Sequence, residues 1–200
     1  MVNLVIFFIM NEEQTLIKSF IAGNRDAFSL IYKTYLNVLF AYGMALGFDR
    51  EMVKDAVQEV FYKLHENKKH LGKLDGLKYY LLKMLKNHLL DMYRSEVDTS
   101  DIDPYELTFS IKTTVLDELI TQEEQTQLQA KIDSLLNLLT NRQREAVYLR
   151  FIQEMEYEEI GKLLDLTPHA SRKLVSRAVK RMREEASIAV LLTIFSLIKF

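Results

Sequence analysis

Two hundred residues suffice for one medium-sized domain or two small ones, and only six glycines and two prolines beside 48% apolar residues exclude collagen-like, disordered and loop-rich all-β chains. The absence of cysteine excludes a disulfide framework, thiolate metal sites and a cysteine nucleophile, and favours a cytoplasmic protein. A net charge of −2 excludes a uniformly basic nucleic-acid coat, so any basic surface must be local.

The chain begins with an apolar segment at residues 2–10. This segment lacks both the basic flank and the small-residue cleavage site of a signal peptide, and it is too short to cross a bilayer. Asn11, with Gln14 three residues later, predicts a helix start directly after it. Translation from Met1 and translation from Met10 both stay open.

Four helical patterns occupy residues 12–96, with breaks at Gly23, at Gly47 and at 72–76. The third is predicted to begin after an Asp49 cap and the fourth after an Asp75 cap. The third buries side chains spaced three and four residues apart: Val53, Ala56, Val57, Val60, Phe61 and Leu64. The fourth is predicted to bury Leu77, Tyr80, Leu81, Met84, Leu85, Leu89 and Met92, and to expose Lys83, Lys86, Asn87, Asp91 and Arg94.

An acidic stretch separates two helical blocks. Residues 96–124 contain nine acids, one base and Pro104, so we predict a linker at 97–115 that becomes helical near residue 115. The second block, 116–186, carries Leu128, Ile132, Leu135, Leu136 and Leu139 at helical spacing, then a capping box at Thr140 and Gln143. The predicted fold is therefore all-α, with two small helical domains at 11–96 and 116–186 and an apolar tail at 187–200.

The apolar tail is shorter than a membrane span. We expect a helix extension that packs on the domain or on a partner, and interfacial membrane contact is the alternative.

The most specific local pattern lies at 157–183. Tyr157, Ile160, Leu163 and Leu164 form the apolar side of a short helix, residues 165–167 form a tight turn, and Thr167 with Pro168 starts a second helix. This spacing is typical of a helix-turn-helix, and residues 168–183 contain six bases and no acid. We predict that Ala170, Leu174, Ala178 and Met182 face the core while the basic face enters the major groove of DNA. A merely solvated basic face is the alternative.

A second basic region, 62–94, has eight bases, three acids and the interleaved Tyr79, Tyr80 and Tyr93. Positive charge beside aromatic planes suits a single-stranded nucleic acid, although tyrosines at helical spacing are also common in cores.

Four segments together resemble a known family. They are Asp55-Ala56-Val57-Gln58-Glu59-Val60-Phe61, the run from Tyr80 through Asn87 to Arg94, Tyr157-Glu158-Glu159-Ile160-Gly161, and Ser176-Arg177-Ala178-Val179-Lys180-Arg181-Met182-Arg183. Their order and separation resemble a bacterial RNA polymerase sigma factor of the extracytoplasmic-function class, over about three quarters of the chain.

The resemblance implies three surfaces. A core-polymerase surface, which would dock on the β′ clamp helices, contains Asp55, Gln58, Glu59, Tyr62 and Lys63. A minus-10 surface, which would read the melting promoter element, contains Tyr79, Lys83, Lys86, Asn87, Asp91 and Arg94. A minus-35 surface, which would read duplex DNA, contains His169, Ser171, Arg172, Lys173, Ser176, Arg177 and Lys180.

The resemblance also implies partners: core RNA polymerase through the β′ clamp helices and the β flap, promoter DNA, and an anti-sigma factor of the kind that is often membrane-anchored. It implies no cofactor, no small-molecule substrate and no catalytic or metal-binding residue. His65 and His70 are five residues apart, which differs from the HExxH spacing of zinc enzymes. The chain departs from the family pattern in lacking tryptophan; His65 and Tyr80 stand near the places where many members have one.

Two other functions fit the same residues. A stand-alone helix-turn-helix regulator, whose N-terminal domain senses a ligand or dimerises, would bind a two-fold operator without polymerase. A helical adaptor that inhibits another factor would make DNA contact incidental, so that alanine at Arg172 and Lys173 would leave its function intact.

Overall fold

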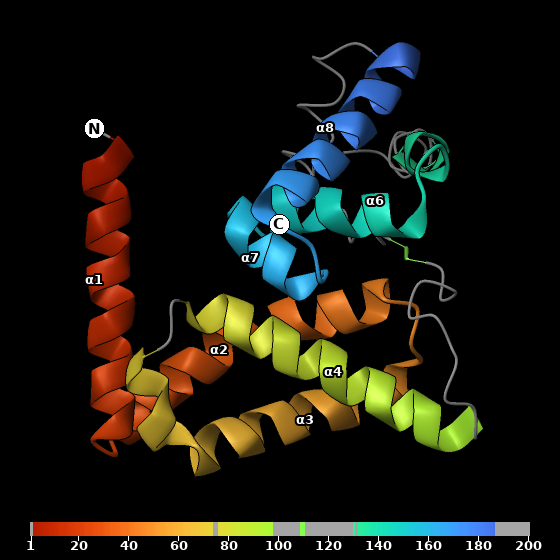
Figure 1. Ribbon diagram of the computed structural model, residues 1–200. Helices are drawn as coiled ribbons and strands as arrows, with labels where there is room; N and C mark the ends of the chain where they lie inside the picture. The colour runs from red at the N-terminus through yellow and green to blue at the C-terminus, as the bar shows by residue number, and fades with distance from the viewer. Residues whose placement is uncertain (1, 74–75, 98–108, 111–129, 131, 187–200) are drawn as a thin grey trace, which may run out of the picture. The chain divides into compact units, whose positions relative to one another are not determined.

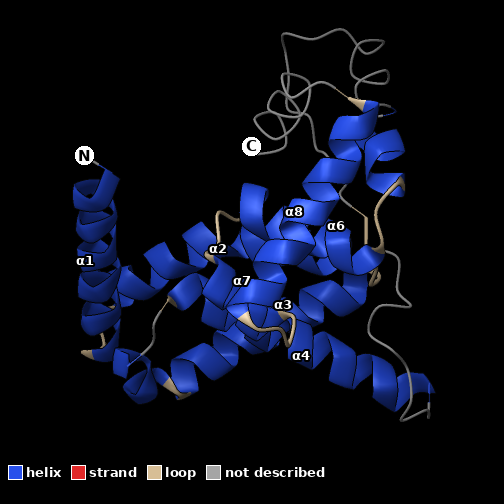
Figure 2. Cartoon of the chain, turned by 45° about the horizontal axis from the view of Figure 1, so that its top comes forward, coloured by secondary structure: helices blue, strands red, loops and turns tan. Residues whose placement is uncertain are grey.

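The computed structural model describes residues 2–73, 76–97, 109–110, 130 and 132–186, and every regular element among them is helical, as predicted (Figure 1 and Figure 2). The chain divides into two compact units, which we call the first unit (Met1–Met44 with Phe48–Ile102) and the second unit (Ala45–Gly47 with Asp103–Phe200). Nearly all of the predicted acidic linker and the whole apolar tail lie outside the described residues.

The first unit contains the four predicted helices. They are α1 (Val2–Ile21), α2 (Arg25–Ala45), α3 (Arg50–Glu66) and α4 (Leu77–Val97), with a short 3-10 helix η1 (Lys68–Lys73) before α4. Gly23 and Gly47 have φ angles of 91° and 93°, a region in which side chains are strained. Glycine therefore allows the chain to turn after α1 and again after α2.

The predicted helix start at Asn11 is wrong. One continuous helix runs from Val2 to Ile21, so Asn11 lies inside α1. No glycine or proline interrupts these residues, and an existing helix adds one hydrogen bond for each residue it includes. None of the described helices combines the length and the apolarity that crossing a lipid bilayer requires.

The α3 helix follows its sequence pattern closely. The Asp49 carboxylate accepts hydrogen bonds from the backbone N–H groups of Glu51 (2.9 Å) and Met52 (3.0 Å), which confirms the predicted cap. All six side chains predicted to face inward are buried. Gly43 of α2 allows this close packing, because a Cβ atom there would lie 2.7 Å from Cγ1 of Val53.

The first residue of α4 forms a hydrogen bond with a residue far away in the sequence. The Leu77 backbone N–H donates to Oε1 of Glu13 on α1 (2.6 Å), so a carboxylate 64 residues away satisfies one N–H of the helix start. The predicted cap, Asp75, lies outside the described residues. Burial and, to a smaller extent, the charge of Glu13 raise the pKa of Tyr35 above its usual range.

Removing this contact should destabilise the first unit. Glu13→Ala should lower its free energy of unfolding by about 1 kcal/mol, the usual cost of losing a capping side chain. Glu13→Gln keeps an oxygen acceptor and should cost less. Urea unfolding measures both variants, and wild-type stability of Glu13→Ala would show that the hydrogen bond to Leu77 contributes nothing.

The core of α4 agrees with the prediction in part. Leu77, Leu81, Leu85 and Leu89 are buried, whereas Tyr80, Met84 and Met92 are half-buried. The buried leucines recur every four residues and form one continuous stripe.

The second unit contains, among its described residues, a helical run at 132–137. It continues with α6 (Asn141–Val147), a short π-helix η2 (Tyr148–Ile152), α7 (Tyr157–Leu163) and α8 (Pro168–Glu185). The predicted capping box is present, with Thr140 and Gln143 bonding each other's backbone N–H. Ile132, Leu135, Leu136 and Leu139 are buried as predicted, and Leu128 lies outside the described residues.

A short piece of the linker region packs on α6. The Phe109 carbonyl accepts a hydrogen bond from Nη1 of Arg144 (3.0 Å), and its ring meets the Tyr148 ring edge to face at 5.6 Å. Burial raises the pKa of Tyr148 to about 12, although a hydrogen bond from Gln153 (3.0 Å) acts in the opposite direction. The chain entering the second unit is thus anchored beside its core.

Candidate nucleic-acid interface

The α7 and α8 helices form the predicted helix-turn-helix. The Leu166 N–H donates to the Gly161 carbonyl (2.7 Å), and Asp165 takes a positive φ of 53° in the turn. Thr167 caps α8 by accepting from the Ala170 N–H (3.2 Å), with Pro168 in the first turn, as predicted. Because Gly161 has no side chain, the turn backbone can lie directly on α7.

The register of α8 differs from the prediction at its start. Ser171, Val175, Ala178 and Met182 are buried, whereas Ala170 and Leu174 are only half-buried. Ser171 has no exposed surface, and its hydroxyl donates to the Tyr157 carbonyl (2.7 Å). The prediction that Ser171 touches DNA is therefore wrong, because this side chain attaches α8 to α7.

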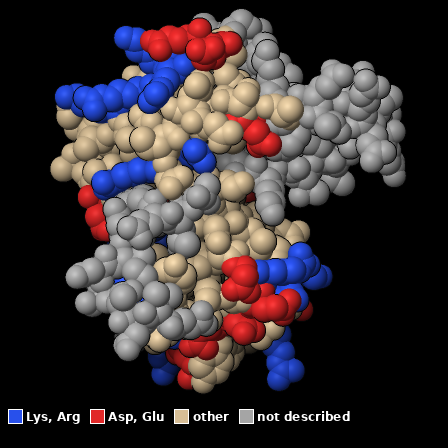
Figure 3. Space-filling view, turned by 90° about the vertical axis from the view of Figure 1, so that its right-hand side faces the viewer, with Lys and Arg blue, Asp and Glu red and all other residues tan. Residues whose placement is uncertain are grey.

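The other predicted residues of α8 share an exposed face. His169, Arg172, Lys173, Ser176, Arg177 and Lys180 are all exposed, and Arg181 and Arg183 extend the same charge. Figure 3 shows Lys and Arg side chains projecting outward on the face that it draws. We call these eight residues the α8 basic face. It combines a rigid helix with concentrated positive charge, which suits a DNA groove.

The structure places the Tyr157 side chain in surroundings that the sequence did not predict. The sequence pattern assigned its ring to the core, but the side chain is half-exposed and lies beside two guanidinium groups. Cζ of Arg150 is 4.8 Å from the ring centroid, and Cζ of Arg172 is 5.1 Å from it. The three residues belong to three different elements, η2, α7 and α8, so the spacing within one helix could not have identified this cluster.

Five of the six predicted minus-10 residues lie along the accessible side of α4. Asn87, Asp91 and Arg94 are exposed, and Tyr79 and Lys83 are half-buried. Nζ of Lys83 lies 5.7 Å from the Tyr79 ring centroid, and Arg94 pairs with Asp91 (3.4 Å). A cation beside an aromatic plane is an arrangement that unstacked bases can use.

The sixth residue, Lys86, was predicted to face outward and does not. Only 6% of Lys86 is exposed, and its backbone position falls between the buried Leu82 and Leu89. The prediction that Lys86 contacts DNA is therefore wrong. Lys86 lies four residues after Leu82 and three before Leu89, so its helix position shares the side of these two buried leucines.

The predicted core-polymerase residues form one polar strip on α3. Asp55, Gln58 and Lys63 are exposed, and Lys63 pairs with the half-buried Glu59 (3.3 Å). Tyr62 is 62% exposed, the largest exposed fraction among the large hydrophobic side chains that the structure describes. We call these five residues the α3 strip, and an exposed aromatic beside charged groups is typical of a protein-binding surface.

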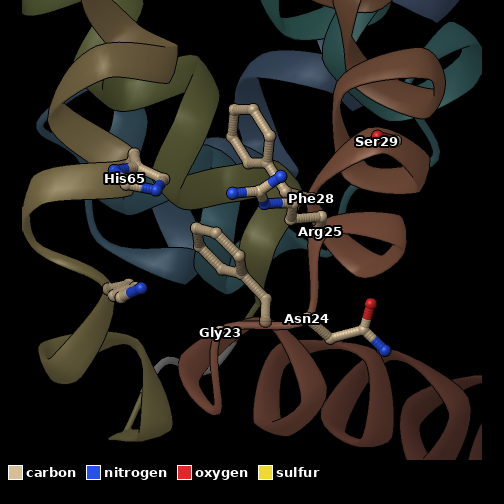
Figure 4. A pocket seen from close by; sticks show the side chains of 8 residues that line it. Gly23, Asn24, Arg25, Phe28, Ser29 and His65 are labelled. Atoms are coloured by element: carbon tan, nitrogen blue, oxygen red, sulfur yellow. The ribbon is translucent and has the colours of Figure 1, made fainter.

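A hollow of about 260 Å³ lies beside the turn between α1 and α2. Figure 4 shows Arg25 and Phe28 extending from α2 toward the side occupied by His65 of α3. The Phe28 ring meets the imidazole of His65 at 5.7 Å and stacks on Phe20 at 5.4 Å. His65, which stands near a position where many members of the resembled family have tryptophan, thus belongs to an aromatic cluster with Phe20 and Phe28. This cluster lies outside the three predicted surfaces.

Comparison with known proteins finds a family match within the second unit. The sequence model of a family described as sigma-70, region 4, matches residues 129–182. The chain is 25% identical over 179 residues to the ECF RNA polymerase sigma factor SigX of Bacillus subtilis (strain 168), covering 80% of this chain and 87% of SigX. It is 22% identical over 158 residues to the ECF RNA polymerase sigma factor SigM of the same organism, covering 76% of this chain and 91% of SigM.

Solved structures have the same fold. The structure of CnrH in complex with the cytosolic domain of CnrY matches with a TM-score of 0.54 and 20% identity, covering 86% of this chain and 94% of that chain. The sigma factor RpoE in complex with the anti-sigma factor NepR from Bartonella quintana matches with a TM-score of 0.55 and 22% identity, covering 78% and 94%. Both matches extend well beyond residues 129–182, so the resemblance includes the first unit as well.

Proposed function

We propose that this chain, which belongs to the extracytoplasmic-function class of the sigma-70 family, binds core RNA polymerase and directs it to a specific set of promoters. The observation that carries this function is the α8 basic face, presented by a helix-turn-helix inside the segment that matches sigma-70 region 4. The chain contributes binding energy and selectivity, while the bond chemistry belongs to the polymerase.

The minus-35 element is the proposed target of the α8 basic face. A major groove admits one α-helix, and arginine can donate two hydrogen bonds to a guanine edge. His169, Arg172 and Lys173 lie in the first turns of α8, where a recognition helix reaches base edges. Arg177, Lys180, Arg181 and Arg183 lie farther along the helix. We therefore propose that their side chains contact the phosphate backbone.

The minus-10 element is the proposed target of the accessible side of α4. Opening this part of the promoter exposes unstacked bases, which stack on aromatic planes beside cations. Tyr79 with Lys83 supplies one such plane, and Asn87 and Arg94 supply hydrogen-bond donors along the same side. We leave Lys86 out of this surface because it is buried.

We propose that other surfaces of the chain bind protein partners. We propose that the α3 strip docks on the β′ clamp helices of core polymerase and that the second unit contacts the β flap. The resemblance to a sigma factor solved with its anti-sigma factor supports regulation by such a partner. Because its proposed targets, polymerase and promoter DNA, are cytoplasmic in bacteria, we place the chain there.

Two single substitutions test the assignment of α8. Arg172→Ala and Lys173→Ala should each weaken promoter binding by about 1 to 3 kcal/mol where the lost contact is to a base. The affinity of the holoenzyme for a promoter fragment, measured at one fixed salt concentration, gives the loss. Lys33→Ala removes the same charge from an exposed position on α2 and should leave the affinity unchanged. Wild-type affinity in both α8 variants would remove α8 as the recognition helix.

One experiment tests the whole function. The purified chain is added to sigma-free core polymerase with fragmented genomic DNA from its source, and transcript starts are mapped with and without it. New starts that share two short sequence elements are expected. Tight binding of the chain alone to a two-fold site, with unchanged start sites, would instead identify a stand-alone regulator.

A further inference from the structure

Arg150, Tyr157 and Arg172 form a cluster between the packed interior of the helix-turn-helix and the α8 basic face. Nη1 of Arg150 donates to the Met155 carbonyl (2.7 Å) and lies 3.3 Å from Oε1 of Glu156. These two contacts fix the guanidinium next to the first turn of α7. The Tyr157 ring lies against this fixed group, with Cζ of Arg150 4.8 Å from its centroid.

The backbone of Tyr157 is fixed as well. Its carbonyl accepts a hydrogen bond from the buried hydroxyl of Ser171 (2.7 Å), which belongs to the first turn of α8. The position of Tyr157 relative to α8 is thus set by one buried hydrogen bond and by one anchored guanidinium. Its ring therefore offers a rigid plane beside the α8 basic face.

Arg172 is the residue of the α8 basic face that lies at this plane. Its Cζ atom is 5.1 Å from the Tyr157 ring centroid, a distance at which the ring attracts a guanidinium. Among the residues that the structure describes, the Tyr157 ring is the side-chain partner of Arg172. An exposed arginine without such a plane would sample many rotamers, and DNA binding would have to fix it.

We propose that Tyr157 is a positioning residue that holds the Arg172 guanidinium in place for promoter DNA. The inference rests on the proposed function and adds a residue that need not touch DNA. Because an aromatic plane is what matters, phenylalanine should replace tyrosine with little loss, whereas leucine, which is similar in apolarity but has no ring, should not.

A double-mutant cycle on the full chain in the holoenzyme separates positioning from a general structural role. With Arg172 present, Tyr157→Leu should weaken promoter affinity about three- to tenfold, since one long side chain must then be ordered on binding. In an Arg172→Ala background the same change should have almost no further effect. In a Lys173→Ala background, which removes an exposed neighbour that does not contact the ring, the full loss should remain. Tyr157→Phe should stay close to the wild type.

The outcomes distinguish this inference from the function on which it rests. An equal loss from Tyr157→Leu with and without Arg172 would show that Tyr157 acts through the fold alone, and no loss in either background would show that it does nothing. Either result overturns the inference while the wild-type holoenzyme still selects its promoter. Failure of the wild type itself to select a promoter would overturn the proposed function and the inference together.

Discussion

Replacing Asp55 and Gln58 together with alanine should abolish stable association with core RNA polymerase while the first unit stays folded. Both side chains are exposed on the α3 strip, beside Tyr62, so neither contributes to the helical core. Polar groups at the centre of an interface lose their partners when truncated, and each can cost about 2 kcal/mol or more. The pair should therefore weaken association by roughly a hundredfold or more.

Co-purification with core polymerase, followed by a titration, measures this loss. Glu184→Gln with Glu185→Gln is the control, because it removes two exposed charges at the end of α8, one more than the test variant. The control should associate normally, and the thermal unfolding of the test variant should match the wild type. Normal association of the Asp55 and Gln58 variant would move the polymerase surface away from α3.

Three helix starts were predictable because their signals are local. Asp49, Thr140 and Thr167 each bond a backbone N–H two or three residues away, and each one caps a helix in the structure. The buried stripe of α3 was predictable for the same reason, since helical periodicity over four turns permits only one inward face. These features depend on neighbours along the chain and on nothing farther away.

Two of the errors concern side chains that the fold buries. Ser171 was predicted to contact DNA because it lies in a basic helix. Its hydroxyl instead donates a hydrogen bond to the carbonyl of Tyr157, 14 residues away, and the side chain is buried between α7 and α8. Lys86 was assigned by its charge, although its position in the helix lies on the buried side. Two other contacts were also not predictable, because they form between different elements. They are the hydrogen bond from Leu77 to Glu13 and the contacts of Arg150 and Arg172 with the Tyr157 ring.

Gly161 provides the most severe test of the helix-turn-helix. A Cβ atom at this position would lie 2.7 Å from the Leu166 carbonyl oxygen and 3.3 Å from the Thr167 carbonyl carbon. Both are backbone atoms of the turn, which the hydrogen bond between Leu166 and Gly161 (2.7 Å) holds in place. A side chain here cannot be accommodated by rotating a neighbour, so the turn or α7 has to move.

Gly161→Val should therefore destabilise the second unit by about 3 kcal/mol, the upper part of the range for overpacked sites, and greatly weaken promoter binding. Association with core polymerase through the α3 strip should persist, because the change lies in the other unit. Gly72→Ala is the matched control in the first unit, since the nearest atom to its added Cβ is 3.8 Å away on Ile21. Thermal unfolding and promoter affinity measure both variants. A Gly161→Val protein that melts and binds like the wild type would mean that the turn does not pack on α7, and the rigid presentation of α8 on which promoter reading depends would then need another cause.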